Sequence, residues 1–213
     1  MLTKFRDPVS GLTHLGAAVA ASFGLAALLW LGRSDPAKEL SLLIYGLSLV
    51  QLFAASAAYH LARVGPAVLL RLRKADHSAI YLLIAGSYTP ICLHFFGGFW
   101  RWGLLGIIWL MALSGVVVKL FVIRAPRWVT AGIYLVMGWM SVLAVHEMLA
   151  SMPAGALAWL VAGGLFYTVG AVVYMLKKPD FYPGRFGFHE IWHIFVILGA
   201  LSHYIVVAVY VAP

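Results

Sequence analysis

The sequence has few charged residues and almost no cysteine, and both shortages restrict the kind of protein it encodes. Only 10% of the 213 residues are Asp, Glu, Lys or Arg, whereas 63% are hydrophobic, and the mean hydropathy is +0.96. A soluble domain carries roughly 25% charged residues, so this composition excludes an ordinary soluble protein. The single cysteine, Cys92, excludes an internal disulfide framework. The composition is that of an integral membrane protein.

Long apolar runs account for most of the chain. A helix needs about 20 apolar residues to cross the hydrocarbon core of a bilayer. Seven runs of that length predict membrane-spanning helices at residues 11–32, 40–62, 76–96, 102–121, 128–150, 154–176 and 189–211. Since these spans and their short loops use nearly the whole chain, we expect one all-α seven-transmembrane domain over residues 1–213. The first run is longer than the apolar region of a signal peptide, which favours a retained span.

The net charge of +8 lies mainly in the gaps between the apolar runs and therefore indicates topology rather than a nucleic-acid partner. The side that holds the N-terminus carries twelve basic residues: Lys4, Arg6, Arg63, Arg71, Arg73, Lys74, Lys119, Arg124, Arg127, Lys177, Lys178 and Arg185. The opposite side carries three: Arg33, Lys38 and Arg101. The positive-inside rule then predicts a cytoplasmic N-terminus and an external C-terminus, in a bacterial inner membrane.

One basic segment between the second and third runs has two interpretations. Residues 64–74 alternate leucines with Arg71, Arg73 and Lys74. This pattern is typical of a short helix lying on anionic headgroups, and it equally fits a basic loop.

Five polar residues share one depth in the predicted bundle. Ionisable residues inside spans are costly and therefore mark functional sites. His60 lies near the C-terminal end of span two, which is on the same side of the membrane as the N-terminus of the chain. Ser56 lies one helical turn away on the same face. Asp76 opens span three, and His189 and His193 open span seven. The helical rise brings all five into a slab about 10 Å thick.

The other histidines fall elsewhere. His94 and His146 lie at the opposite ends of their spans, and His203 lies about 15 Å beyond His193 along span seven. His14 has the right depth, but its direction is undetermined, so it is a candidate for supporting the site. His77 points about 100° away from its neighbour Asp76 on a helix, so a structural role is preferred.

Three imidazoles with oxygen donors nearby form a ligand set for zinc, and a fourth position left to water is typical of a catalytic site. Zinc can lower the pKa of that water to about 7. Asp76 would accept its proton, while the Ser56 hydroxyl would bind the water or a substrate carbonyl.

The segment from His189 to His193 also reads H-E-x-x-H, in which zinc proteases use the glutamate as a base. Glu190 can instead interact with the positive end of its helix. We favour Asp76 as the base.

Each residue taken singly has a simpler interpretation. His60 can reach the interface from a helix end, Asp76 can be an N-cap, and Ser56 can be a small residue for helix packing. Their coincidence at one depth favours a shared site.

The motifs Ser56-x-x-x-His60, Asp76 and His189-x-x-x-His193 resemble those of the hemolysin III branch of the progestin and adipoQ receptor superfamily. That superfamily includes the adiponectin receptors and is related to alkaline ceramidases. The resemblance implies zinc held by His60, His189 and His193, with Asp76 and Ser56 around a bound water. It also implies hydrolysis of a lipid amide bond.

The sequence therefore leaves two functional hypotheses open. The first is a membrane-embedded zinc hydrolase of lipid amides or esters, with membrane lipids as substrate and no nucleic-acid partner. The alternative is a non-enzymatic sensor, channel or membrane-homeostasis protein in which zinc is structural. A proton or ion conduit is less favoured, because the half of the bundle around His203 lacks a continuous charged path. The oligomeric state stays open.

Overall fold

The computed structural model describes residues 5–122, 125–182 and 186–213 and is built from helices. Their bounds are α1 (Pro8–Gly32), α2 (Pro36–Leu61), α3 (Pro66–Phe95), α4 (Gly98–Phe121), α5 (Arg127–Trp139), the 3-10 helix η2 (Met140–Ala144), α6 (Val145–Ser151), α7 (Ala154–Leu176) and α8 (Phe188–Tyr210). The all-α fold class is confirmed. Lys4, Arg124 and Arg185, which contributed to the predicted charge asymmetry, lie outside the described residues.

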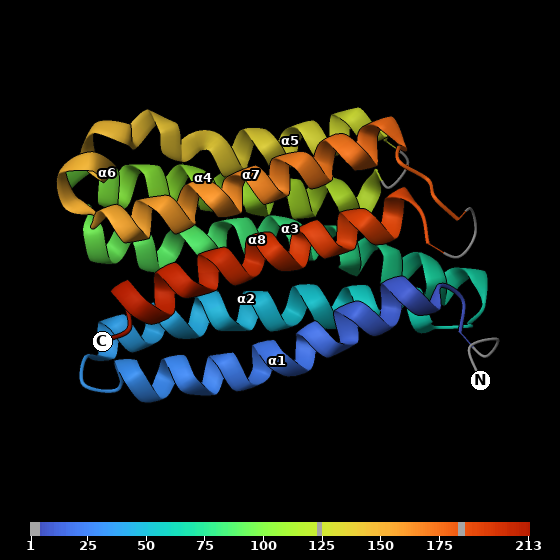
Figure 1. The fold of residues 1–213 in the computed structure, drawn as a ribbon, viewed down its shortest axis with the longest axis horizontal. Helices are drawn as coiled ribbons and strands as arrows, with labels where there is room; N and C mark the ends of the chain where they lie inside the picture. The colour runs from blue at the N-terminus through green and yellow to red at the C-terminus, as the bar shows by residue number, and fades with distance from the viewer. Residues whose placement is uncertain (1–4, 123–124, 183–185) are drawn as a thin grey trace.

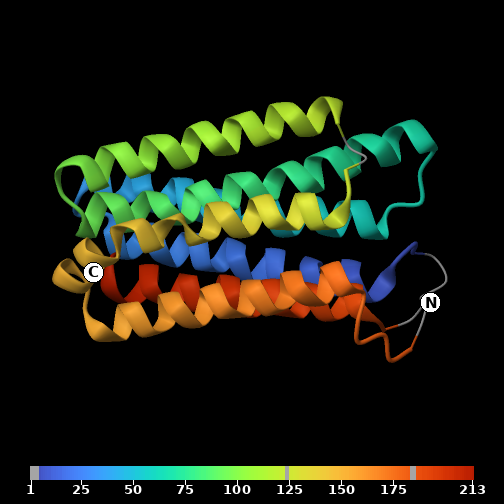
Figure 2. The same ribbon diagram turned by 90° about the horizontal axis from the view of Figure 1, so that it is seen from above.

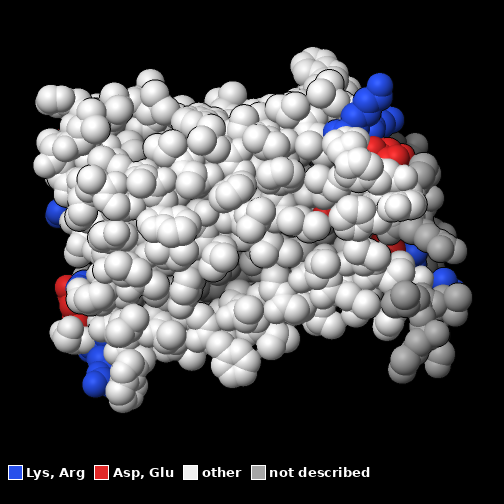
Figure 3. Space-filling model, viewed as in Figure 1, with Lys and Arg blue, Asp and Glu red and all other residues white. Residues whose placement is uncertain are grey.

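The described residues contain seven segments long and apolar enough to span a membrane, as predicted, because α5, η2 and α6 together form one apolar segment, Arg127–Ser151. The helices run lengthwise side by side, and α1 begins at the opposite end of the bundle from the end where α8 finishes (Figures 1 and 2). On the face shown in Figure 3, charged side chains gather at these two ends and leave an uncharged belt between them. This distribution is that of a protein whose middle faces lipid and whose ends face water. Which end faces the cytoplasm stays a prediction.

Proline defines where the first three helices begin. Pro8, Pro36 and Pro66 each occupy the first helical position, where no backbone N–H is needed and the fixed φ of proline suits the helix. At α2 the carboxylate of Asp35 also accepts hydrogen bonds from the N–H groups of Ala37 and Lys38. The first three helices accordingly begin before the apolar runs that predicted them.

The basic segment 64–74 is helical from Pro66 onward, so the loop interpretation is wrong. The helix is continuous with α3 rather than separate, and its position at a membrane surface stays a prediction. The start of α3 projects beyond the neighbouring helices at one end of the bundle (Figures 1 and 2). Asp76 lies ten residues inside this helix, so the N-cap interpretation of Asp76 is wrong. No glycine or proline interrupts the chain between Pro66 and Asp76, so nothing ends the helix there.

The fifth span is interrupted at η2, and Tyr88 of α3 supports the break. The Tyr88 hydroxyl accepts a hydrogen bond from the Ser141 N–H at 2.8 Å and lies 2.8 Å from the Gly138 carbonyl oxygen. Irregular backbone inside a membrane persists only where its polar groups find partners. Tyr88 supplies them.

Apolar packing joins α1, α2 and α8. Leu28 of α1, Leu42 and Leu49 of α2, and Val207 of α8 belong to one buried cluster. At the other end of the bundle the C-terminal end of α2 lies beside the N-terminal end of α8, where the ring centroids of His60 and His189 are 5.0 Å apart.

Candidate metal centre

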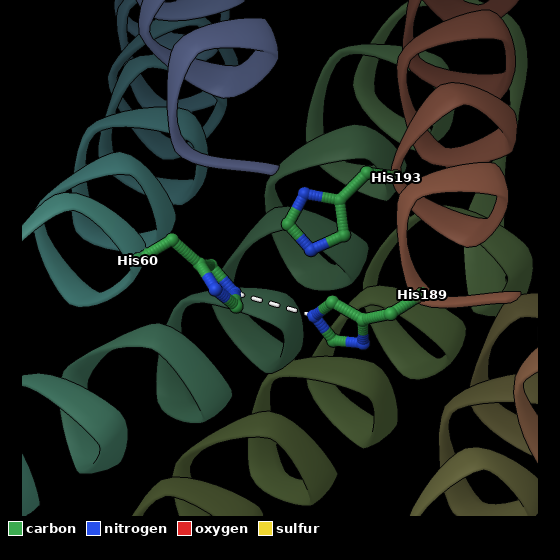
Figure 4. A group of neighbouring side chains, drawn as sticks. All are labelled: His60, His189 and His193. Atoms are coloured by element: carbon green, nitrogen blue, oxygen red, sulfur yellow. Dashed lines mark hydrogen bonds between the residues drawn. The ribbon is translucent and has the colours of Figure 1, made fainter. Parts of the chain in front are cut away.

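Three histidines from two helices converge at the end of the bundle that holds the N-terminus. His60 extends from the last turn of α2, and His189 and His193 extend from the first two turns of α8 (Figure 4). One ring nitrogen from each lies within 4.8 Å of the others. His189 and His193 point the same way because residues four apart share a helix face.

The geometry of these residues suits a metal ion. Nε2 of His60 lies 3.4 Å from Nε2 of His189, and two nitrogen ligands of a tetrahedral zinc ion are about 3.4 Å apart. The ring of His193 has its centroid 4.9 Å from that of His60 and 4.7 Å from that of His189. The three histidines therefore lie close enough to hold a metal ion.

Asp7, which the sequence analysis did not single out, orients His60. Its Oδ2 lies 3.0 Å from Nδ1 of His60, and its backbone N–H donates to the His60 carbonyl oxygen at 2.9 Å. Asp7 occupies the N-cap position of α1, yet its carboxylate makes no capping bond there. A carboxylate at one ring nitrogen sets the tautomer and leaves the other nitrogen free for a metal. The remaining nitrogen of His60, Nε2, is the one that faces His189.

The charge of Asp7 is stabilised at this position. Burial raises the pKa of Asp7, but the hydrogen bond with His60 and the positive charge of Arg6 outweigh it, so the pKa lies below its ordinary value. Arg6 lies 3.0 Å from the same carboxylate oxygen. Asp7 is therefore an anion that accepts from His60. The only sequence signal for it was an aspartate before a helix-starting proline, at the same end of the bundle as His60.

His14 lies against the cluster, which answers the question of direction that the sequence left open. Its ring stacks on that of His193, with centroids 3.9 Å apart and an interplanar angle of 25°. Nε2 of His14 is 3.5 Å from the His193 carbonyl oxygen, and the side chain is buried. His14 therefore supports His193 from α1.

Ser56 and Asp76 are both buried and line the same cavity as His60 and His189. Ser56 lies one turn before His60 on α2, and its hydroxyl makes no hydrogen bond to any residue that the structure describes. Oδ2 of Asp76 lies 3.4 Å from Nδ1 of His77, its neighbour on α3. Two oxygen-bearing side chains therefore face the space in front of the histidines.

Glu190 is held by other contacts. Its Oε1 accepts from the Ser10 hydroxyl of α1 at 2.9 Å, and its Oε2 accepts from the Gly187 N–H at 2.9 Å. The second bond caps the start of α8, and the first ties α8 to α1. Both carboxylate oxygens are thus engaged in positioning helices.

A single cavity of about 590 Å³ leads away from the histidines. Its walls are mainly apolar, and they include His60 and Asp76 near one end and His203 and Met148 farther along the bundle. Val142, Val145 and Val161 also line it, and each is about half exposed. The lining of the cavity therefore includes side chains that are not fully enclosed by the bundle.

Three other histidines, His94, His146 and His203, are not part of the cluster. His94 and His146 are exposed, in α3 and α6. His203 lines the cavity but is not among the three converging histidines. The sequence prediction, based on the helical rise, that these three histidines lie outside the cluster is therefore confirmed.

Comparison with known proteins identifies relatives over most of the chain. Residues 2–204 match the model of a family described as "Haemolysin-III related". The "Hemolysin-3" protein of Bacillus cereus is 36% identical over 170 residues, which cover 80% of this chain and 74% of the relative. The human "Monocyte to macrophage differentiation factor" is 31% identical over 210 residues, 95% of this chain and 83% of the relative. The "Adiponectin receptor protein" of Drosophila melanogaster is 32% identical over 147 residues, 62% of this chain and 33% of the receptor.

Proposed function

The chain belongs to the hemolysin III family within the progestin and adipoQ receptor superfamily, and from this membership and the histidine cluster we propose that it is a membrane-embedded, zinc-dependent hydrolase of lipid amide or ester bonds. It is a multi-pass bacterial membrane protein. The bilayer lipids around it are the natural source of substrate.

One observation carries the proposal. Two of the three clustered histidines, His60 and His189, line a largely apolar cavity that is large enough for a lipid chain, and the oxygen-bearing side chains of Ser56 and Asp76 line the same cavity. Ligand sites typically combine apolar walls with a few polar groups at one place. A purely structural metal site needs neither the cavity nor the oxygen groups.

We propose zinc as the metal and His60, His189 and His193 as its ligands. Imidazole nitrogens suit zinc, and three protein ligands are typical of a catalytic rather than a structural site. When bound, zinc would supply Lewis-acid chemistry that activates water and polarises an acyl carbonyl. Asp7 would keep His60 in the tautomer that presents Nε2.

The side chains of the cavity would then perform the proton transfers. Asp76 takes a proton from water as the oxygen of that water attacks the acyl carbon. The Ser56 hydroxyl donates a hydrogen bond to the substrate carbonyl oxygen. When the C–N or C–O bond breaks, Asp76 returns the proton to the leaving amine or alcohol, so the products are a fatty acid and a headgroup fragment. Glu190 has no part in these steps because both of its oxygens hold helix termini.

The test is a hydrolysis assay on purified protein with a defined metal content. Wild type loaded with zinc is incubated with ceramides, N-acyl amides and lysolipids, and released fatty acid is measured by mass spectrometry. We expect release from at least one lipid class, and its loss in Asp76→Asn that retains the metal. Protein with full zinc content that hydrolyses no member of the panel would overturn the proposal.

A structural role for zinc is the second candidate, and one observation favours it. The three histidines come from α2 and α8, and Ser10 and Glu190 already tie α1 to α8 at the same end of the bundle. A metal ion there would cross-link helices that are distant in sequence. In that case removing the metal lowers thermal stability in a protein that never releases fatty acid.

The placement in the membrane is part of the proposal. Basic residues are in excess at the end of the bundle that holds the three-histidine cluster, which favours the cytoplasmic side of an inner membrane for this end. The polar part of a substrate would then reach the site from the inner leaflet, and its chain would enter past the half-exposed valines that line the cavity.

A further inference from the structure

His203 and Tyr167 form a second polar position on the wall of the cavity, away from the three converging histidines. Both side chains line the cavity, and their ring centroids lie 5.5 Å apart with an interplanar angle of 69°. His203 follows His193 by ten residues on α8, which corresponds to about 15 Å of helical rise. This polar pair therefore lies partway along the cavity, among mainly apolar walls.

Two glycines make room for these rings. Gly163 of α7 faces the ring of His203, and a Cβ added there would overlap ring atoms of that histidine. Gly199 of α8 faces the ring of Tyr167, and a Cβ added there would approach three ring carbons to 2.9 Å. Each helix therefore has a glycine at the position where the polar ring of the other helix packs against it. This reciprocal fit holds both rings in place.

The hydrogen bonds of the pair are incomplete. Nε2 of His203 lies 3.3 Å from the Leu160 carbonyl oxygen. A carbonyl only accepts, so Nε2 carries the proton and Nδ1 is left as an acceptor. Neither Nδ1 of His203 nor the Tyr167 hydroxyl makes a hydrogen bond within the described part of the chain. The pair therefore offers one acceptor, Nδ1 of His203, and one hydroxyl that can donate or accept, on rings whose centroids lie 5.5 Å apart.

A hydroxyl group is the ligand that matches these two hydrogen-bonding groups. It can donate to Nδ1 of His203 and accept from the Tyr167 hydroxyl at the same time. The apolar surroundings disfavour a charged group, because burying an unpaired charge is costly. We propose that His203 and Tyr167 form a subsite for a hydroxyl carried partway along the hydrocarbon chain of a lipid in the cavity. The acyl-lipid class rests on the proposed function, whereas binding at the subsite requires neither metal nor hydrolysis.

The test is equilibrium binding of fatty acids to the full chain in detergent. Stearate is compared with one hydroxystearate that carries its hydroxyl near mid-chain and another that carries it next to the carboxyl group. We expect wild type to bind the mid-chain isomer about fivefold to tenfold more tightly than stearate, the effect of about one net hydrogen bond. Tyr167→Phe removes only the hydroxyl, so it should abolish this preference and leave the affinity for stearate unchanged.

Tyr204→Phe is the matched control. Tyr204 follows His203 on α8, but its hydroxyl donates to the Gly24 carbonyl oxygen at 3.0 Å, and it does not line this cavity. Its loss should leave the mid-chain preference intact. Equal affinity for stearate and the mid-chain isomer, a preference that survives Tyr167→Phe, or no binding of any of the three acids would each overturn the subsite. A stronger preference for the isomer with its hydroxyl next to the carboxyl group would also overturn it.

The same measurement in His60→Ala separates this inference from the proposed hydrolase. If the subsite exists, the mid-chain preference persists in His60→Ala, whether or not wild type hydrolyses any lipid. If wild type hydrolyses lipids but shows no mid-chain preference, the hydrolase stands and the subsite fails.

Discussion

The two histidine positions of the cavity differ in the residues around them. At one end His60, His189 and His193 converge within 4.8 Å, and Asp7 accepts a hydrogen bond from His60. Farther along, His203 stands against Tyr167 and a backbone carbonyl. The same side chain is available for a metal ion in the first case and for a neutral hydrogen bond in the second.

This difference teaches that convergence, rather than burial, makes a histidine a ligand. His193 and His203 lie on the same helix and both contribute to the interior of the bundle. Only His193 has two other imidazoles in reach and carboxylates nearby that can offset the charge of a cation. Each experiment below changes one end of the cavity and uses another residue as its reference.

Loss of a ligand should have the largest effect. We expect wild-type protein to contain about one zinc ion per chain, and His193→Ala to contain none above background, because two histidines leave the coordination incomplete. His203→Ala should keep the full amount, since it lies outside the cluster. Elemental mass spectrometry on purified, monodisperse protein measures both. Equal zinc in His193→Ala and wild type would remove the distinction between the two positions.

Asp76 and Glu190, two of the carboxylates near the cluster, should differ in their effect on turnover. Asp76→Asn should lower the rate of fatty-acid release by about 10²–10⁴-fold, the usual contribution of a general base. Glu190→Gln should leave the rate nearly unchanged, because Glu190 holds the start of α8 and the Ser10 hydroxyl. Both variants should retain zinc, which the same elemental analysis checks. The opposite order of effects would assign the base to the H-E-x-x-H motif.

Metal removal should destabilise the end of the bundle that holds the cluster. Zinc at about 100 times its dissociation constant adds about 2.7 kcal/mol of stability, which corresponds to roughly 5–10 °C in Tm for a chain of this size. A thermal melt with and without chelator measures the shift in wild type. His60→Ala should show no shift, and His146→Ala, altered at an exposed residue of α6, should show the wild-type shift. A chelator effect of equal size in His60→Ala would mean that the metal binds elsewhere.

Loss of the hydrogen bond between His60 and Asp7 should have the smallest effect of the four changes. Asp7→Asn should weaken zinc binding by about 10–100-fold without abolishing it, as expected for a residue that orients a ligand. The measurement is competition with a chelator of known affinity, and the visible spectrum of the cobalt-substituted protein reports any change in ligand geometry. Asp35→Asn is the control, because Asp35 caps α2 and asparagine caps helices equally well. Unchanged zinc affinity in Asp7→Asn would reduce the contact with His60 to a helix-packing bond.

The seven spans and the depth of each histidine could be read from the sequence. Hydropathy locates a helix along the chain, and a rise of about 1.5 Å per residue locates every residue along the bundle axis. That is why His60, His189 and His193 were assigned to one end, and why His94, His146 and His203 were separated from them. Both results depend on a single coordinate, the distance along a helix, which the order of residues specifies.

The tertiary structure decided everything that depends on rotation and lateral packing. It brought Asp7 to His60, stacked His14 on His193, and engaged both oxygens of Glu190. It also extended α3 through the basic segment, and it joined the histidine cluster to His203 through one cavity. Sequence order does not specify which way a helix face points or which helices touch, because these follow from how all the side chains pack together.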